Sequence, residues 1–430
     1  MLEIKDKWIK KLSNKNILIW GYGKEGKSTL KFLKEFCINT KISIMDDKEV
    51  VIDDKNISVG RDYDFEEFDY VFKSPGIVLD KNKKNQDIIS QTDIFVECFR
   101  DNIIGVTGTK GKSTTSSLIA FILKSVGKKV ELVGNIGVPC LDVWDKVDDD
   151  TIIVFEISCH QLEYIKVSPK YAVLLNIYPE HLDHYGTFEE YSAAKKNIYR
   201  FQKHGDTLII NEDIKVSNLS SNVIECSIGN NTFNEGIIVF DRKIYLEEYT
   251  NLLGVHNRYN IAIAYLILEK FNITEKMFLK ALSQFKPLPH RLEIVGKYND
   301  ILFVDDSIST IGQSTISAIK SINNVGVVLI GGMDRGIDYS DLVDFLINCD
   351  IEYIILMYAS GKRIAKMLDD TGTNKQYLYK NNLQDAVDYV KKLKLNNKVC
   401  LLSPAAASYG DFINFEDRGN KFKEMVKNEK

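Results

Sequence analysis

The chain has 430 residues, of which 44% are hydrophobic and 27% charged, and its formal net charge is −4 at pH 7. This composition is typical of globular proteins and excludes a long disordered chain, and the absence of a basic excess argues against a general nucleic-acid-binding protein. The longest apolar run, 261–268, has eight residues, whereas a membrane-spanning helix needs about 20. Seven scattered cysteines without a CxxC pair indicate reduced thiols. We therefore expect a cytoplasmic, multidomain protein with no nucleic-acid or membrane partner.

The first predicted domain, residues 1–91, follows the pattern of a small doubly wound α/β unit. An apolar run at 16–20 predicts a buried parallel strand, and a glycine-rich turn and a helix to Phe36 follow it. Further strands are predicted at 42–45 and 70–72. Folds of this kind bind ligands where their parallel strands end.

The glycine-rich turn of this domain contains Gly21, Gly23 and Gly26. In its strand–turn–helix context it could hold NAD, with Asp46 or Asp47 on the ribose. It could equally cradle the diphosphate of another nucleotide, or only close a tight turn. The residues of the turn leave these three interpretations open.

The rest of the chain also alternates strands and helices. Residues 92–286 have predicted strands at 102–106, 151–155, 172–176 and 207–210, mixed β structure near 237–245, and a helix over 257–271. A hinge is predicted at Pro287-Leu288-Pro289, and the last domain, 287–430, has predicted strands at 301–305, 325–330, 353–357 and 399–402.

The strongest local signal is the loop Gly108-Thr109-Lys110-Gly111-Lys112-Ser113-Thr114, which lies between a predicted strand and a helix that runs to Lys124. Glycines let backbone N–H groups turn toward a polyphosphate, Lys112 adds a full positive charge, and Ser113 is placed to ligate Mg²⁺. The loop departs from the strict G-x4-G-K form because Val106 replaces the first glycine. A glycine-rich turn without a ligand is the alternative, but the flanking elements favour a nucleoside triphosphate site.

Acidic and basic side chains follow the neighbouring predicted strands. Glu156 ends one strand, where a carboxylate beside a phosphate loop is the usual second ligand of Mg²⁺. His181 could bind a metal or cap a helix, and His160 is interpreted as structural. Lys195 and Lys196 lie on a predicted helix, where paired lysines usually form a solvated face.

Four further polar residues are candidates for capping, binding or catalytic roles. Asn257 and Asn260 open an apolar helix and could be capping groups only. Arg291 could reach a transferring phosphoryl group across a cleft or form a surface ion pair. Asp306 ends a predicted strand and could bind a ribose hydroxyl.

In this order and at these separations the motifs resemble those of the Mur ligases, and the resemblance covers essentially the whole chain. The motifs that carry it are Ser74-Pro75-Gly76, the Gly108–Thr114 loop, Gly134-Asn135-Ile136-Gly137, Glu156-Ile157-Ser158, Gln161-Leu162-Glu163, Glu180-His181-Leu182-Asp183, Ala193-Ala194-Lys195, His256-Asn257, His290-Arg291, Asp306-Ser307, and the segments 402–405 and 414–419. No single motif identifies the family, but all of them occur in the family's order and spacing.

The resemblance implies an α/β protein of three domains. Residues 1–91 would form an N-terminal Rossmann-like domain for the UDP end of the substrate, 92–286 a central P-loop ATPase domain, and 287–430 a C-terminal Rossmann-like domain for the incoming amino acid. The implied activity is that of an ATP-dependent ligase in peptidoglycan precursor synthesis. It would add glutamate, D-glutamate by the best match, to UDP-N-acetylmuramoyl-L-alanine through an acyl phosphate. We expect it to act as a monomer.

The resemblance also implies roles for individual residues. Those with catalytic roles would be Lys112, His181, Lys195 and Arg291. ATP would be bound by Gly108, Thr109, Lys110, Gly111, Lys112, Ser113, Thr114, Asn260, Arg291 and Asp306. Two Mg²⁺ ions would be held by Ser113, Glu156, His181 and a carbamylated Lys195, which replaces the solvated-face interpretation. The substrates would contact Gly21, Gly23, Ser74, Pro75, Gly76, Asn135, Ser158, Gln161, Thr310, Arg335, Ser408 and Phe415.

Two positions depart from the pattern of the D-glutamate-adding members. Ile308 stands where they usually have a lysine, and Arg335 stands where they usually have a second one. Arg335 keeps a cation whose forked shape is not interchangeable with that of lysine. Neutral drift would explain both changes. The alternative is that the chain adds L-glutamate instead.

Three other functions compete with this one. A nicotinamide-dependent oxidoreductase would use the first glycine-rich turn but leave the phosphate loop and Glu156 without a purpose. A folylpolyglutamate-synthase-like ligase shares the ATPase core but normally lacks a domain like residues 1–91. A non-catalytic nucleotide-binding scaffold is the third alternative.

Overall fold

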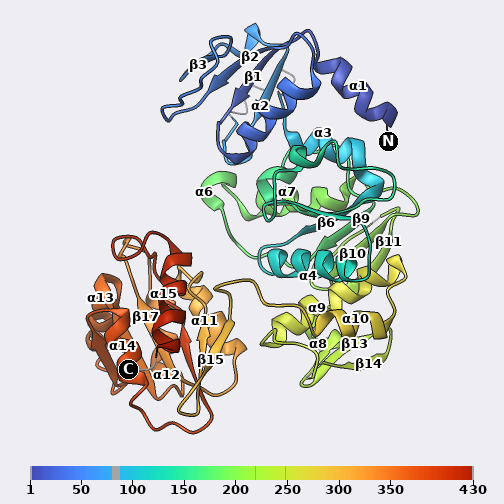
Figure 1. Cartoon of the computed structure of the whole chain (residues 1–430). Helices are drawn as coiled ribbons and strands as arrows, with labels where there is room; N and C mark the ends of the chain where they lie inside the picture. The colour runs from blue at the N-terminus through green and yellow to red at the C-terminus, as the bar shows by residue number, and fades with distance from the viewer. Residues whose placement is uncertain (1, 80–87, 218, 247, 429–430) are drawn as a thin grey trace. The chain divides into compact units, whose positions relative to one another are not determined.

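The computed structural model describes residues 2–79, 88–217, 219–246 and 248–428, and the chain divides into two compact units (Figure 1). Unit 1 comprises Met1–Leu246 and Tyr259–Leu282, and unit 2 comprises Glu247–Arg258 and Ser283–Lys430. Within the described ranges, no helix is both long and apolar enough to cross a membrane. The domain boundaries after residues 91 and 286 stay a prediction.

Unit 1 begins with a five-stranded parallel sheet in the order β3-β2-β1-β4-β5 (blue in Figure 1). Its elements are α1 (Leu2–Leu12), β1 (Asn16–Trp20), α2 (Lys24–Phe36), β2 (Lys41–Met45), β3 (Ser58–Gly60), β4 (Tyr70–Lys73) and β5 (Ile88–Ile89). Because β1 pairs with β2 on one side and β4 on the other, the chain order reverses at β1. Ligands bind at such a switch point, beyond the carboxyl ends of the strands.

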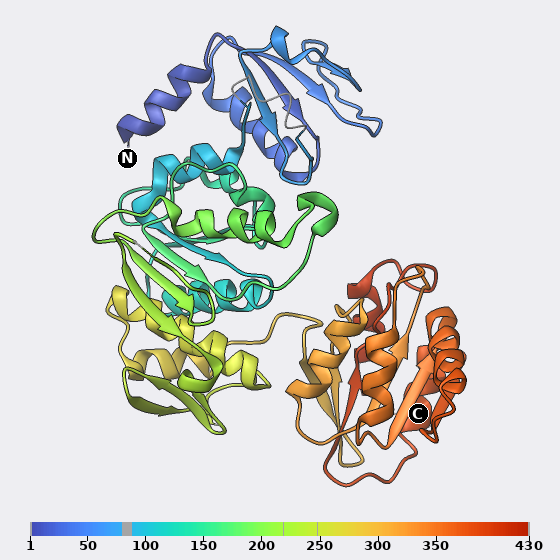
Figure 2. The ribbon, with the colours of Figure 1, turned by 180° about the vertical axis from the view of Figure 1, so that it is seen from behind.

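A second parallel sheet of unit 1 has six strands in the order β11-β10-β9-β6-β8-β7 (cyan to green in Figure 2). The strands are β6 (Ile103–Thr107), β7 (Val130–Gly134), β8 (Ile152–Glu156), β9 (Tyr171–Leu174), β10 (Thr207–Asn211) and β11 (Asn222–Cys226). The main helices are α3 (Gln91–Phe99), α4 (Lys112–Ser125), α5 (Cys159–Leu162), α6 (Leu182–Tyr185) and α7 (Phe188–Arg200). β6 lies between β8 and β9, so the predicted phosphate loop follows a central strand of this sheet.

The rest of unit 1 is a small antiparallel sheet and two helices. The sheet joins β12 (Thr232–Phe233), β13 (Gly236–Val239) and β14 (Arg242–Tyr245), after the short α8 (Ile228–Asn231). The helices are α9 (Val255–Leu268), whose first residues belong to unit 2, and α10 (Glu275–Leu282).

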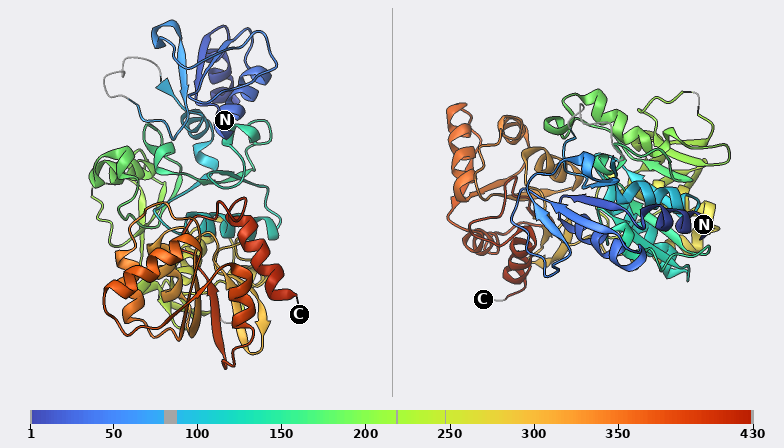
Figure 3. Two further views of the ribbon diagram at one scale, coloured as in Figure 1. Left: turned by 90° about the vertical axis from the view of Figure 1, so that its left-hand side faces the viewer. Right: turned by 90° about the horizontal axis from the view of Figure 1, so that it is seen from above.

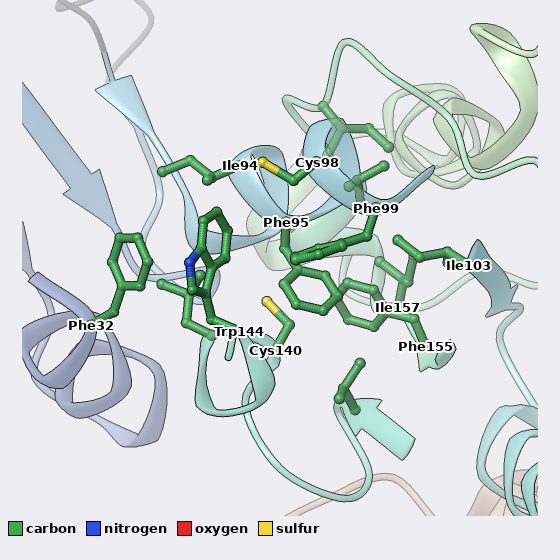
Figure 4. Packing of buried hydrophobic residues seen from close by; sticks show 14 of the residues in the cluster. Phe32, Ile94, Phe95, Cys98, Phe99, Ile103, Cys140, Trp144, Phe155 and Ile157 are labelled. Carbon is green, nitrogen blue, oxygen red and sulfur yellow. The ribbon is translucent and has the colours of Figure 1, made fainter. Parts of the chain in front are cut away.

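One aromatic cluster packs the two large sheets of unit 1 together (Figure 4). The Trp144 ring lies edge-on to Phe32 of α2 at 4.9 Å and to Phe99 of α3 at 5.3 Å between ring centroids. Phe95 of α3 contacts Phe155 of β8 in the same way, at 5.9 Å. All five side chains are buried, so elements of both sheets share one apolar core.

Unit 2 contains a six-stranded mixed sheet in the order β15-β16-β20-β17-β18-β19. The strands are β15 (Glu293–Tyr298), β16 (Ile301–Asp305), β17 (Val325–Gly331), β18 (Tyr353–Met357), β19 (Tyr377–Lys380) and β20 (Lys398–Leu402). Helices α11 (Gly312–Ser321), α12 (Ser340–Asn348) and α13 (Tyr358–Asp370) share the core of one face, and α14 (Leu383–Val390) and α15 (Phe415–Lys427) that of the other (Figure 3). Only β15 runs antiparallel to its neighbour. This arrangement confirms the predicted α/β class.

Candidate functional site

The predicted phosphate loop connects β6 to α4 and has the backbone that such a loop requires. Gly111 has φ +89°, and a Cβ atom there would come within 2.7 Å of the Asn260 Oδ1 atom, so only glycine fits. The Lys112 Nζ atom donates to the carbonyl oxygens of Gly108 at 2.9 Å and Thr109 at 3.0 Å. Burial lowers the pKa of Lys112. The lysine is thus held over the loop, where a phosphate would replace the carbonyl contacts.

Asn176, two residues after the end of β9, fixes the same loop from the neighbouring strand. Its Oδ1 atom accepts the N–H groups of Thr109 at 3.0 Å and Lys110 at 2.8 Å, and its Nδ2 atom donates to the Lys110 carbonyl at 3.0 Å. The Thr109 hydroxyl and the Tyr191 hydroxyl are hydrogen-bonded at 2.9 Å. The sequence analysis assigned no role to Asn176, although its place after the strand beside β6 was a usable signal.

Lys195 lies inside the protein rather than on a solvated face, so that first interpretation is wrong for it. Its side chain, on α7, is 1% exposed, and its Nζ atom donates to the Gly108 carbonyl at 2.9 Å. Burial lowers the pKa of Lys195 to about 8, and the positive charge of Lys112 adds to this. The neutral amine, which is the form that reacts with CO₂, is therefore far more populated than in an exposed lysine. Lys196, the next residue, is half-buried.

Glu156 ends β8 and carries an unsatisfied carboxylate oxygen. Its Oε1 atom accepts from the Asn135 Nδ2 atom at 3.0 Å, and its backbone carbonyl accepts from the Asn135 N–H at 3.0 Å. Its Oε2 atom is buried and has no hydrogen-bond partner among the described residues. A buried carboxylate oxygen without a donor fits a ligand of a divalent cation.

His181 stands at the start of α6 with a left-handed backbone, φ +56°. Its side chain does not cap the helix, so the capping interpretation is wrong. The ring packs edge-on to His160 at 4.9 Å between centroids, and its Nε2 atom is 3.8 Å from a Glu180 carboxylate oxygen. Burial lowers the pKa of both histidines, which favours the neutral imidazole that ligates metals.

A cleft of about 1050 Å³ opens in unit 1 between the ends of the central strands of its two sheets. Many residues predicted from the sequence line it: Gly21, Gly23, Ser74, Pro75, Gly76, Lys112, Asn135, Ser158, Gln161, His181 and Lys195. His160 also lines it, although the sequence favoured a structural role. The structure thus joins the glycine-rich turn, the Ser74-Pro75-Gly76 loop and three of the four catalytic candidates, Lys112, His181 and Lys195, in one cavity.

Two acidic residues of the cleft, Glu25 and Asp46, make contacts that the sequence did not predict. Glu25, at the start of α2, accepts a hydrogen bond from the Gln161 Nε2 atom at 2.7 Å, and burial raises its pKa. Asp46 accepts the Tyr22 N–H at 2.7 Å, which lowers the pKa of Asp46. Asp46 therefore closes the glycine-rich turn from the next strand.

The remaining predicted residues of unit 1 lie close to the phosphate loop. Glu156 and Asn260 are buried, and Asn260 faces Gly111, as a group near the nucleotide should. Ser113 and Thr114 occupy the first turn of α4, where Ser113 is half-buried.

Unit 2 holds the other predicted residues. Asp306 follows β16 and is buried, and its Oδ2 atom accepts from the Ser403 hydroxyl at 2.9 Å. Burial raises the pKa of Asp306 to about 6. The Arg291 Nε atom is buried, with no hydrogen-bond partner among the described residues, which does not favour a surface ion pair.

The predicted amino-acid-binding residues differ in exposure. Thr310 is half-buried, Ser408 is buried and Phe415 begins α15, where its carbonyl accepts from the Ser307 hydroxyl at 2.8 Å. Arg335 is exposed in the loop after β17.

The chain is similar in sequence to known proteins over nearly its whole length. Residues 106–268 match the family model described as the Mur ligase middle domain. A relative from Clostridium acetobutylicum is 31% identical, covering 98% of each chain, and one from Oenococcus oeni is 32% identical, covering 96% of this chain and 97% of its own. Both are named UDP-N-acetylmuramoylalanine–D-glutamate ligase.

Solved structures agree on the fold. MurC, the UDP-N-acetylmuramate–alanine ligase of Thermotoga maritima, superposes with a TM-score of 0.58 at 18% identity, covering 95% of this chain and 98% of its own. MurF of the same organism, solved with ADP, gives a TM-score of 0.59 at 17% identity, covering 97% of this chain and 95% of its own. The relatives at over 30% identity, which match nearly the whole chain, show that the chain belongs to the Mur ligase family.

Proposed function

We propose that this protein is an ATP-dependent carbon–nitrogen ligase that adds D-glutamate to UDP-N-acetylmuramoyl-L-alanine in peptidoglycan precursor synthesis. The names of the relatives that span nearly the whole chain support this. The observation that carries the proposal is the cluster around the phosphate loop. There, Lys112 and the buried Lys195 both donate to the Gly108 carbonyl, and Glu156 keeps a free buried carboxylate oxygen.

The chemistry explains why such a cluster is needed. A carboxylate is a poor electrophile, so its oxygen first attacks the γ-phosphorus of ATP, forming an acyl phosphate and releasing ADP. The amine of the amino acid then attacks the carbonyl carbon, and phosphate leaves from the tetrahedral intermediate. Lys112 and Arg291 would offset the negative charge that collects as carboxylate and phosphates approach. No protein nucleophile takes part.

Divalent cations fit the residues present. Ser113, Glu156 and His181 would hold them, since their hydroxyl, carboxylate and imidazole groups match known ligands. Bound Mg²⁺ would supply charge neutralisation between the phosphates and the substrate carboxylate. Lys195 would complete the set after carbamylation: its neutral amine bonds to the carbon of CO₂, a proton leaves, and a cation becomes an anion.

The amino acid is D-glutamate in this proposal, because the reported relatives are named for that isomer. The L-glutamate alternative, raised by Ile308 and Arg335, has no support from them. The oxidoreductase and the non-catalytic scaffold are likewise unsupported, since the chain belongs to a ligase family. Thr310, Ser408 and Phe415 would contact the glutamate, and Arg335 would supply the cation that Ile308 does not.

The deciding experiment incubates the protein with UDP-N-acetylmuramoyl-L-alanine, ATP, Mg²⁺ and either glutamate isomer. We expect ADP and a product heavier by one glutamate residue with D-glutamate only. Phosphate release and mass spectrometry would measure the two. Lys112→Ala and Lys195→Ala should abolish phosphate release, while the matched control Lys196→Ala keeps it. Absence of a product with D-glutamate would disprove the assignment.

Carbamylation needs its own test because it precedes catalysis. Protein equilibrated with ¹³C-bicarbonate should show a carbamate carbon signal by NMR. The signal should persist in Lys196→Ala and vanish in Lys195→Arg. An unchanged signal in Lys195→Arg would mean that another amine carries the carbamate.

A further inference from the structure

The loop that carries Arg335 is anchored on both sides of that residue. On the β17 side, the Gly331 N–H donates to the Pro404 carbonyl and the Met333 N–H to the Ala407 carbonyl, both at 2.8 Å. Gly332 is held by helix α13: its N–H donates to the Ser360 hydroxyl at 2.8 Å. The Ser360 N–H donates back to the Gly332 carbonyl at 3.1 Å. The first half of the loop is therefore fixed by hydrogen bonds of its own backbone, one of them to the Ser360 hydroxyl.

The second half of the loop is held by one side chain of α13, Arg363. Its guanidinium makes two bonds to the Asp334 carboxylate, at 2.7 and 2.9 Å, and a third to the Ile337 carbonyl at 2.6 Å. The same group lies over the Tyr339 ring, 4.6 Å from its centroid. The Asp334 carboxylate also accepts the Gly336 N–H at 3.0 Å. A forked ion pair of this kind fixes direction as well as distance.

These contacts place the exposed side chain of Arg335 in a turn whose backbone is held on both sides. Its neighbours on both sides, Asp334 and Gly336, are bonded to one another around it. Met333, two residues before it, pairs with Ala407, directly before the predicted glutamate-binding residue Ser408. A cation and a buried hydroxyl are therefore presented from one end of the same sheet.

Helix α13 holds both halves of the loop that carries Arg335. Ser360 and Arg363 are three positions apart, so they lie on one face of the helix, one turn from each other. Each holds one half of the loop. A flexible arginine on a fixed backbone loses less conformational entropy on binding an anion than one on a mobile loop.

We propose that Arg363 is a positioning residue for the amino-acid substrate: through its pair with Asp334 it aims Arg335 at a carboxylate of the incoming amino acid. This rests on the proposed function above and adds to it a residue that touches no substrate. The competing explanation is that Arg363 only stabilises unit 2.

The two explanations differ in steady-state kinetics. Arg363→Ala should raise the KM for D-glutamate about tenfold, as expected when a binding group loses its orientation. Its kcat and its KM for ATP should stay within about twofold of the wild-type values. Arg363→Lys keeps the charge but not the forked shape, so its KM for D-glutamate should lie between those of the wild type and Arg363→Ala. The exposed neighbour Lys362→Ala is the matched control and should change neither constant.

A double-mutant cycle tests whether Arg363 acts through Arg335. If it does, Arg363→Ala adds nothing to the KM defect of Arg335→Ala. Additive defects, or an unchanged KM in Arg363→Ala, would overturn the inference. If Arg363→Ala does not fold by circular dichroism, the comparison rests on Arg363→Lys, whose KM must then rise. Wild-type protein without turnover on D-glutamate would instead refute the proposed function itself.

Discussion

Asp306 illustrates the cost of keeping a carboxylate inside a domain. Its carboxylate is 3% exposed and accepts from the Ser403 hydroxyl, yet burial raises its pKa from 3.8 to about 6. Between these two pH values the folded state binds more protons than the unfolded state, so the contribution of Asp306 to stability falls as pH rises. Above pH 6 the ionised group costs on the order of 2–3 kcal/mol.

We therefore predict that Asp306→Asn stabilises unit 2 while it weakens nucleotide binding. The amide can still accept from the Ser403 hydroxyl but carries no charge to desolvate. Urea unfolding at pH 7 to 8 should show the variant to be more stable than the wild type. This difference in stability should disappear below about pH 4, where the Asp306 carboxyl group is protonated in both the folded and the unfolded wild-type protein. The KM for ATP should rise, since the variant loses the proposed ribose contact. Equal stability at pH 7 would contradict this account of Asp306.

Individual site residues could be predicted only where the spacing of residues along the chain determines their place in the fold. The phosphate loop was predictable because glycine, lysine and serine must follow one strand in a fixed order, and the structure places Lys112 over it. The burial of Lys195 was not predictable from its helix, because packing of α7 against the loop decides which face is inside. Asn176 was missed because a single asparagine after a strand is only a weak signal of a functional role.

At the level of elements, buried parallel strands were predicted well. The strands at 16–20, 301–305 and 353–357 agree with the structure to the residue, because continuous apolar runs mark strands that are covered on both faces. Two of the missed strands, β11 and β15, lie at sheet edges, with mostly exposed or half-buried residues. Edge strands lack that apolar signal, so the sequence could not show them.

The aromatic cluster of unit 1 leads to a prediction at this scale. Trp144 directly follows a short 3-10 segment, Cys140–Val143, and contacts α2 and α3, and its carbonyl accepts from the Lys5 Nζ atom of α1 at 2.7 Å. Truncation of a buried tryptophan removes its apolar contacts and leaves a cavity. Trp144→Ala should lower the free energy of unfolding of unit 1 by about 3–5 kcal/mol.

Urea denaturation followed by circular dichroism would measure this loss. Tyr245→Ala, at a site 59% exposed on β14, is the control and should cost about 0.5 kcal/mol or less. A similar small loss for Trp144→Ala would mean that the elements around it hold together without the cluster.

At the scale of the whole molecule, each compact unit has its own buried core. An extensive cluster of buried apolar residues and smaller ones beside it belong to unit 1, and two clusters cover the two faces of the sheet of unit 2. A chain built in this way is not expected to unfold in a single two-state step. The three tryptophans, Trp8, Trp20 and Trp144, all lie in unit 1, so their fluorescence reports on that unit alone.

Arg418 offers a way to perturb unit 2 selectively. Its side chain is 1% exposed and donates to the Ser307 hydroxyl and carbonyl and to the Ala406 carbonyl, at 2.8–3.0 Å. It also faces the charge of the buried Asp305. Arg418→Met would remove the donor to these acceptors and a positive charge near the Asp305 carboxylate, a loss of about 3–5 kcal/mol.

We expect thermal unfolding of Arg418→Met to separate two optical signals that report different parts of the chain. Far-UV circular dichroism, which includes the helices and strands of unit 2, should show an early transition that the wild-type protein lacks. Tryptophan fluorescence should keep its wild-type midpoint, because all three indoles lie in unit 1. If both signals shifted together by the same amount, the two units would share one cooperative transition, and the separate cores would not act as independent folding units.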